Sequence, residues 1–143
     1  MKLSKRHKAY FSVAKAVSEL GDFWQTKIGC AVIYRHKIIS TGYNQCKTNP
    51  LQKKYNSYRF FEDEGRHCLH AEVDALLSLV NRKDIDFSNV SLYTYREYKN
   101  GSLAPARCCK SCMALVKKLG IRHIYYTTTE GFAHEEINKG VSK

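Results

Sequence analysis

The sequence lacks any apolar run long enough to cross a membrane, and it is poor in acidic residues. Its 143 residues include 13 aspartates and glutamates against 24 lysines and arginines, a formal net charge of +11. The basic first eight residues are not followed by the apolar core of a signal peptide. We therefore expect a soluble, cytoplasmic protein with no membrane partner. The charge favours polyanionic partners, such as nucleotides or nucleic acid, and a solvated lysine-rich surface explains it equally well.

The sequence also has no internal repeat and no low-complexity segment, and its length suits one buried domain, which we expect to span residues 1–143. Apolar residues at helical spacing predict helices over 4–20, 70–81 and 110–119. Runs rich in β-formers predict strands over 28–34, 37–43, 90–96 and 121–127, the first two joined by the turn Arg35-His36. This alternation predicts an α/β sandwich with a mixed sheet. The polar tail adds a short predicted helix over 133–139.

One stretch has no clear periodicity. Residues 44–69 form a segment longer than most connections, and we expect a long loop insertion at about 45–69. Its aromatic content, including Tyr55 and Tyr58, argues against a disordered insertion. The length is typical of a functional loop.

Two short motifs carry the chemistry. His70-Ala71-Glu72 opens one predicted helix, and Cys109-Lys110-Ser111-Cys112 opens the next. One histidine and two cysteines form a ligand set typical of a catalytic zinc ion with an open fourth position for water. Glu72 then stands beside the metal as a proton carrier, as in the zinc-dependent nucleobase deaminases.

A C-x-x-C motif alone also occurs in redox dithiols and in zinc ribbons. A ribbon needs a second C-x-x-C, and this sequence has none. A thioredoxin-like dithiol leaves His70 and Glu72 without a role. The two motifs in this order favour the deaminase interpretation.

The chain has six cysteines, and in a cytosolic protein these are more often metal-binding or buried than paired in disulfides. Cys30 lies in an apolar run and is predicted to be a core thiol. Cys46, His67 and Cys68 supply ligand types for a second, structural zinc ion in the long loop. Loop thiols without a metal are the equally supported alternative.

The sequence resembles the cytidine and deoxycytidylate deaminase superfamily. The resemblance rests on segments 69–76 (LHAEVDAL) and 109–113 (CKSCM), with the upstream segments 27–33 (KIGCAVI) and 40–44 (STGYN). It implies a three-layer α/β/α sandwich around a five-stranded mixed sheet and a homo-oligomer. It also implies Zn²⁺ on His70, Cys109 and Cys112, with Glu72 as the catalytic acid and base. Substrate contacts are implied for Asn44 and for the backbone amides of Ala71 and Cys109.

Two positions depart from that resemblance. Cys108 stands where the family usually has proline directly before the first cysteine. The ligand is therefore either Cys109 or Cys108. Asp74 stands where many deoxycytidylate deaminases have asparagine, which weakens the assignment to that subgroup.

The substrate has two interpretations. The first is a pyrimidine nucleotide, deoxycytidylate converted to deoxyuridylate, with the phosphate held by a basic residue such as Lys27, Lys53 or Arg107. The second is cytosine or adenine in single-stranded DNA or RNA, stacked on aromatic residues such as Trp24, Tyr55 or Tyr58. A non-enzymatic zinc or nucleic-acid binding module is a third alternative, in which Glu72 has no role.

Overall fold

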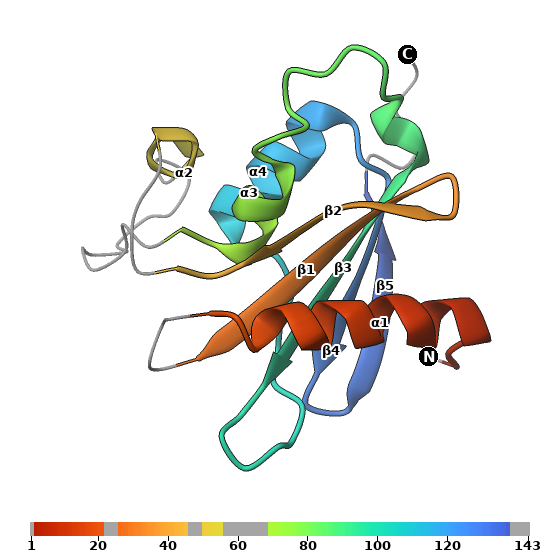
Figure 1. Ribbon diagram of the computed structural model, residues 1–143, viewed down its shortest axis with the longest axis vertical. Helices are drawn as coiled ribbons and strands as arrows, with labels where there is room; N and C mark the ends of the chain where they lie inside the picture. The colour runs from red at the N-terminus through yellow and green to blue at the C-terminus, as the bar shows by residue number, and fades with distance from the viewer. Residues whose placement is uncertain (1, 22–25, 46–49, 56–68, 138–143) are drawn as a thin grey trace.

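A five-stranded mixed sheet forms the centre of the protein (Figure 1). The computed structural model describes residues 2–21, 26–45, 50–55 and 69–137. The strand order is β2-β1-β3-β4-β5, in which only β3 and β4 pair in parallel. The sheet confirms the predicted fold class. The strand bounds are β1 Lys27–Tyr34, β2 Lys37–Tyr43, β3 Val90–Glu97, β4 His123–Thr128 and β5 Gly131–Glu136.

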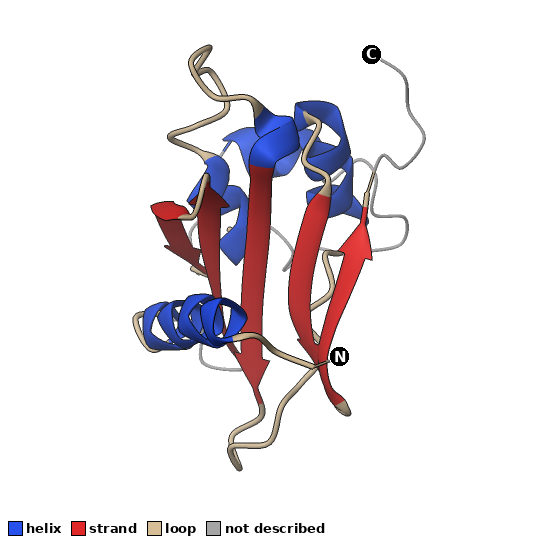
Figure 2. Ribbon diagram, turned by 90° about the vertical axis from the view of Figure 1, so that its right-hand side faces the viewer, coloured by secondary structure: helices blue, strands red, loops and turns tan. Residues whose placement is uncertain are grey.

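Helices cover both faces of this sheet (Figures 1 and 2). The helix α1, Lys5–Ser18, lies on one face, and α3, Ala71–Leu76, lies with α4, Lys110–Leu119, on the other. The three-layer arrangement follows from these positions. None of the described helices has the length and apolar character needed to span a membrane.

The two faces have separate cores because side chains alternate along each strand. Cys30 and Leu92 point toward α3 and α4 and join a mostly aliphatic cluster. Ala31 and Tyr93, their neighbours in sequence, point toward α1 and join an aromatic cluster. Cys30 is fully buried, as its apolar setting predicts.

The β1–β2 turn is the two-residue hairpin that the sequence predicts. Arg35 and His36 adopt φ angles of 50° and 68°, and Tyr34 pairs with Lys37 across the turn. Positive φ at both central residues matches the right-handed twist of the strands. The turn therefore carries two basic residues at its tip.

Two predicted helices differ from the structure. The helix predicted over 70–81 ends at Leu76, and 77–81 continues as turns in which the Leu79 amide donates to the carbonyl of Leu76 at 2.9 Å. The helix predicted over 133–139 is wrong where the structure describes it. That segment forms β5, which pairs with β4 by an antiparallel ladder that includes Ala133 opposite Tyr126.

The long segment after β2 contains a short helix, α2 (Pro50–Tyr55), that the sequence pattern does not predict. Gln45 and Leu69 pair their backbones at 2.9 and 3.0 Å. This bridge brings the two ends of the segment together directly before His70. Residues 46–49 and 56–68 lie outside the described residues, and with them Cys46, His67, Cys68 and Tyr58.

Candidate metal centre and active site

The strands β2, β3 and β4 run in the same direction, so their carboxyl ends lie at one edge of the sheet. His70 and Cys109 are the residues directly before α3 and α4, and both have extended backbone angles. Loops at the carboxyl ends of strands are the usual place for a binding site in α/β folds. Both sequence motifs therefore meet where this architecture places functional groups.

The side chains of His70, Cys109 and Cys112 converge. His70 Nδ1 lies 3.4 Å from Cys109 Sγ and 3.3 Å from Cys112 Sγ, and all three ligand atoms lie within 4.8 Å of one another. Tetrahedral zinc with bonds of roughly 2.0–2.3 Å holds its ligand atoms about 3.6 Å apart. The nitrogen and sulfur atoms already have nearly that separation. This donor set therefore fits a zinc ion.

The charge state of Cys109 also suits a metal. Hydrogen bonds from the Cys112 thiol and from His70 lower the pKa of Cys109 to about 3. The same hydrogen bond and burial raise the pKa of Cys112 above its ordinary value. Cys109 is thus a ready thiolate, the form in which cysteine binds zinc.

Glu72 lies in the first turn of α3 with only 6% of its surface exposed. Burial, followed by the negative charge of Cys109, raises the pKa of Glu72 above the ordinary glutamate value. A buried carboxyl with a raised pKa can hold and release a proton near neutral pH. This is the property that a proton carrier needs.

The adjacent cysteines Cys108 and Cys109 point to different partners. Cys108 is buried and hydrogen-bonds the carboxylate of Glu72, and burial together with that charge raises the pKa of Cys108. Cys109, by contrast, faces His70. Of the two thiols that the sequence leaves open as ligands, the described geometry favours Cys109.

Gln52 is a site residue that sequence reasoning missed. It lies on α2, is fully buried, and accepts a hydrogen bond from the His70 amide at 3.0 Å through Oε1. The contact fixes the backbone from which the imidazole projects. An aperiodic segment gave no signal for it, because only the fold brings position 52 next to position 70.

Contacts from β2 hold α3 in place. Asp74 Oδ2 accepts a hydrogen bond from the Tyr43 amide at 3.0 Å, and the Ser40 hydroxyl donates to the Ala75 carbonyl at 2.6 Å. A Cβ added at Gly42 would lie 2.3 Å from the Ala75 nitrogen. Asp74 therefore has a structural partner, and α3 packs too closely on β2 for any side chain at position 42.

Asn44 is 6% exposed, and backbone groups occupy both ends of its amide. Oδ1 accepts from the Ile28 amide at 2.9 Å, and Nδ2 donates to the Thr26 carbonyl at 2.9 Å. These bonds fix the start of β1 beside the end of β2. The predicted substrate contact of Asn44 stays a prediction, as do those of the Ala71 and Cys109 amides.

A cavity of about 780 Å³ opens beside Cys109 along α4. Arg107, Lys110 and Lys117 give it a basic lining. Arg107 is already paired with Glu135, its Nη2 lying 3.0 Å from Oε1. Of the other predicted phosphate contacts, Lys27 lines a different cavity. The side chains of Lys53, Trp24, Tyr55 and Tyr58 lie outside the described residues.

The family model for the cytidine and deoxycytidylate deaminase zinc-binding region matches residues 4–128 of the chain. The chain belongs to this family. The matched residues include both motifs and the β1–β2 hairpin that supports them, so the family match confirms the resemblance seen in the sequence. Zinc is accordingly the metal for which the His70, Cys109 and Cys112 cluster is suited.

Solved structures of deaminases share the fold of this family member. The apo dCMP deaminase of cyanophage S-TIM5 is 20% identical, with a TM-score of 0.62 over 89% of this chain and 86% of that one. The cytidine deaminase of Burkholderia pseudomallei is also 20% identical, with a TM-score of 0.63 over 92% and 93%. The cytidine deaminase of Mycobacterium leprae is 16% identical, with a TM-score of 0.57 over 95% and 97%. No curated protein sequence matches the chain.

Proposed function

We propose that this protein is a hydrolytic deaminase of cytosine bases, with deoxycytidylate as its leading substrate. The observation that carries the proposal is the buried Glu72 in the same helical turn as His70, next to the cluster with Cys109 and Cys112. A zinc ion bound to those three residues would supply the acidity that makes water a nucleophile at neutral pH. A binding module would have no use for a buried carboxyl at this point.

Glu72 performs the proton transfers in the proposed reaction. Its carboxylate takes a proton from the water that attacks C4 of cytosine and delivers it to the N3 ring nitrogen. It then transfers the remaining hydroxyl proton to the amino group, which leaves as ammonia, and uracil forms. The raised pKa of Glu72 keeps this carboxyl able to carry a proton between the two transfers. The Cys108 thiol orients the carboxyl through its hydrogen bond.

Deoxycytidylate is favoured by two observations. The fold is similar to that of the S-TIM5 dCMP deaminase, whose structure in complex with dCMP and dUMP is also a match. The cavity beside Cys109 has a basic lining that suits a phosphate group. The net charge of +11 is the observation that favours the alternative, a base in single-stranded DNA or RNA. A homo-oligomer stays a prediction, which analytical ultracentrifugation checks.

The test is product analysis of the zinc-loaded protein with deoxycytidylate and, in parallel, a cytosine-containing single-stranded oligonucleotide. Glu72→Gln should keep one zinc ion per chain and lose about 100- to 10,000-fold in turnover, the usual effect of removing a general acid or base. Glu130→Gln, an identical change at an exposed turn, should keep full activity. Full turnover by Glu72→Gln would contradict the mechanism. Conversion of the oligonucleotide but not of deoxycytidylate would mean that the substrate is a base in single-stranded nucleic acid.

A further inference from the structure

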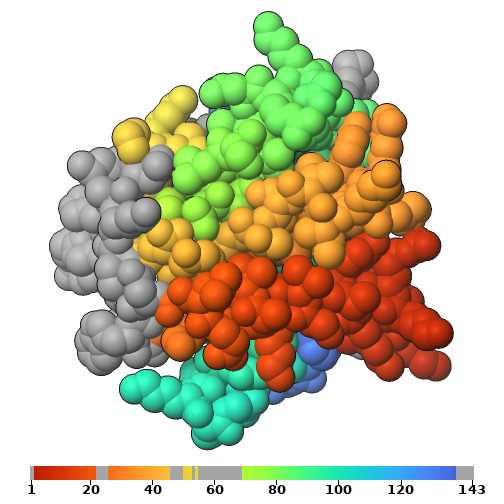
Figure 3. All heavy atoms as spheres, in the orientation of Figure 1, coloured from red at the N-terminus to blue at the C-terminus, as the bar shows by residue number. Residues whose placement is uncertain are grey.

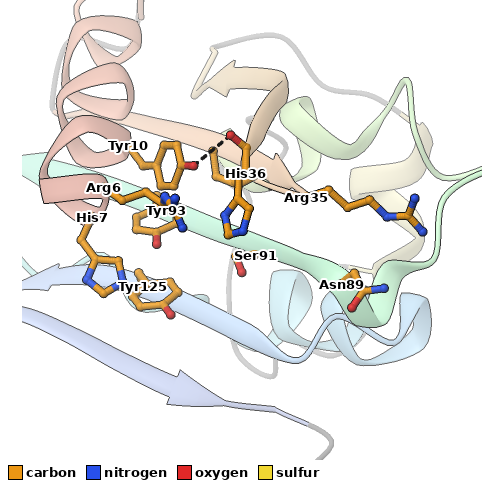
Figure 4. Close-up of a pocket in the computed structure, with 10 residues that line it drawn as sticks. Arg6, His7, Tyr10, Arg35, His36, Asn89, Ser91, Tyr93 and Tyr125 are labelled. Atoms are coloured by element: carbon orange, nitrogen blue, oxygen red, sulfur yellow. Dashed lines mark hydrogen bonds between the residues drawn. The ribbon is translucent and has the colours of Figure 1, made fainter. Parts of the chain in front are cut away.

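A second cavity lies on the opposite face of the sheet from His70 and the two cysteines. It has a volume of about 520 Å³ and lies between the start of α1 and the β1–β2 turn. Arg6 and His7 line it from α1, and Arg35 and His36 line it from the turn, where the Arg35 side chain extends away from the other three (Figure 4). Figure 3 shows these two segments adjoining each other at the surface. We call this the α1 cavity.

The α1 cavity has a strongly basic lining. It contains two arginines and two histidines, and none of the described residues that line it is acidic. Arg6 and Arg35 form no ion pair with any described acidic residue. The nearby Asp86 carboxylate accepts hydrogen bonds from Ser88 and Asn89 instead. Arg35 Cζ lies 5.0 Å from the Tyr34 ring centroid, a cation–π contact that leaves the N–H groups of Arg35 able to bind an anion.

The floor of the α1 cavity supplies hydroxyl donors. Tyr93, only 3% exposed, stacks on Tyr125 with ring centroids 4.4 Å apart, and Ser91 lies beside them. Burial, together with a hydrogen bond to the Tyr125 hydroxyl, raises the pKa of Tyr93, so the Tyr125 and Ser91 hydroxyls are the ones left to donate to a ligand. The other face of the Tyr125 ring is stacked on His134. Because each Tyr125 face is covered, a ligand would meet hydroxyl groups rather than a free aromatic face.

The cavity walls are held in a fixed relation. The Tyr10 hydroxyl donates to the His36 carbonyl at 3.0 Å, which ties the β1–β2 turn to α1 (Figure 4). Ser4 caps α1 and also exchanges hydrogen bonds with His7. The His36 backbone and the His7 side chain are therefore held in place without a ligand. Such preorganisation lowers the entropic cost of binding.

We propose that the α1 cavity binds the phosphate group of a small phosphorylated compound, with Arg6 on the phosphate oxygens and the exposed Arg35 side chain turning toward them. Arginine forms bidentate hydrogen bonds to phosphate, and tyrosine and serine hydroxyls complete the set of donors. The volume is that of a small-molecule site. The ligand is recognised by its phosphate and hydroxyl groups and needs no planar base. This inference stands independently of the deaminase proposal.

Ribose 5-phosphate is the probe, because it has a phosphate and hydroxyl groups but no base. Its dissociation constant is measured by calorimetry on the zinc-loaded protein in 150 mM NaCl, which screens long-range charge. The double variant Arg6→Gln/Arg35→Gln should raise the dissociation constant at least about tenfold, since each loses a charge-assisted hydrogen bond. Both arginines are exposed, so the variant should keep its circular dichroism spectrum and its zinc content.

The matched control is Arg82→Gln/Arg122→Gln, which removes the same charge at two arginines outside the cavity. It should change the dissociation constant less than about twofold. Equal weakening by both double variants, or no binding to the unaltered protein, would overturn the proposal. Weakened binding of a single-stranded oligonucleotide with unchanged ribose 5-phosphate affinity would also overturn it, in favour of a strand backbone. Turnover of deoxycytidylate should be the same in both variants.

Discussion

The two faces of the sheet use polar side chains in different ways. On the α3 and α4 face, His70, Cys109 and Cys112 meet beside a largely aliphatic core, at the starts of two helices. On the α1 face, tyrosines and histidines stack in a row whose polar ends border a cavity. The metal centre depends on where α3 and α4 begin. The α1 cavity depends on exposed side chains at one surface.

This difference predicts how each site responds to mutation. Moving a helix start by a fraction of an ångström separates ligand atoms that a metal must contact together. Replacing an exposed arginine removes one charge and leaves the backbone in place. Zinc content should therefore report on the α3 and α4 face, and phosphate affinity on the α1 face.

The largest expected effect comes from the adjacent cysteines. Cys109→Ala removes a ligand, so zinc should fall from one ion per chain to nearly none, and turnover by more than about 1,000-fold. Cys108→Ala is the matched control. It should keep its zinc and lose about tenfold in turnover, because it removes only a hydrogen bond to Glu72. Metal analysis and kinetics check both variants, and zinc loss in Cys108→Ala alone would reverse the assignment.

The helix starts can be predicted from the sequence because both motifs stand where apolar periodicity begins. The choice between Cys108 and Cys109 as the zinc ligand cannot be predicted from the sequence, since adjacent thiols differ only in the direction that the backbone gives them. In the structure, the extended backbone at Cys109 turns its thiol toward His70, while Cys108 points to Glu72. Which thiol faces the metal site therefore depends on how the start of α4 is oriented relative to His70, which lies 39 residues away in sequence.

Three other features could not be predicted from the sequence, for a related reason. β5 has a polar sequence that shows no clear alternation, and its strand conformation depends on pairing with β4. Gln52 lies in an aperiodic segment, and its role follows from contact with the His70 amide. The α1 cavity combines Arg6, His36 and Tyr93, which come from a helix, a turn and a strand. Tertiary contacts rather than local pattern determine all three features.

The next largest effect is expected from alanine substitutions at two glycines, one on each face of the sheet. A Cβ at Gly42 would lie 2.5 Å from the Ala71 carbonyl oxygen, and one at Gly29 would lie 2.0 Å from that of Ala14. Gly42→Ala and Gly29→Ala should each lower the free energy of unfolding by about 3 kcal/mol, because backbone must move in both. Urea unfolding measures this loss.

The zinc content of the folded protein then distinguishes the two substitutions. Gly42→Ala displaces α3 and with it His70, so folded protein should hold less than one zinc ion per chain. Gly29→Ala displaces α1, and folded protein should keep its full zinc content. Equal zinc content in the two variants would contradict the view that the metal centre depends on α3 and not on α1.

The smallest effect concerns the ion pair that links the segment before Cys109 to β5. Hydrogen bonds from Arg107, followed by one from Tyr126, hold the pKa of Glu135 below its ordinary value of 4.5. The stabilisation is therefore fully present above pH 4.5 and is lost as the pH falls through the lower folded-state pKa. Both partners are partly exposed, so solvent screening limits the contribution to about 0.5 kcal/mol at pH 7. Urea unfolding of Glu135→Gln should show that loss at pH 7 and a progressively smaller loss as the pH falls below 4.5, whereas Glu130→Gln should match the unaltered protein throughout. If the difference in unfolding free energy between Glu135→Gln and the unaltered protein grew on acidification, the carboxylate of Glu135 would destabilise the fold. The Arg107 contact would then not hold β5 to the segment before Cys109.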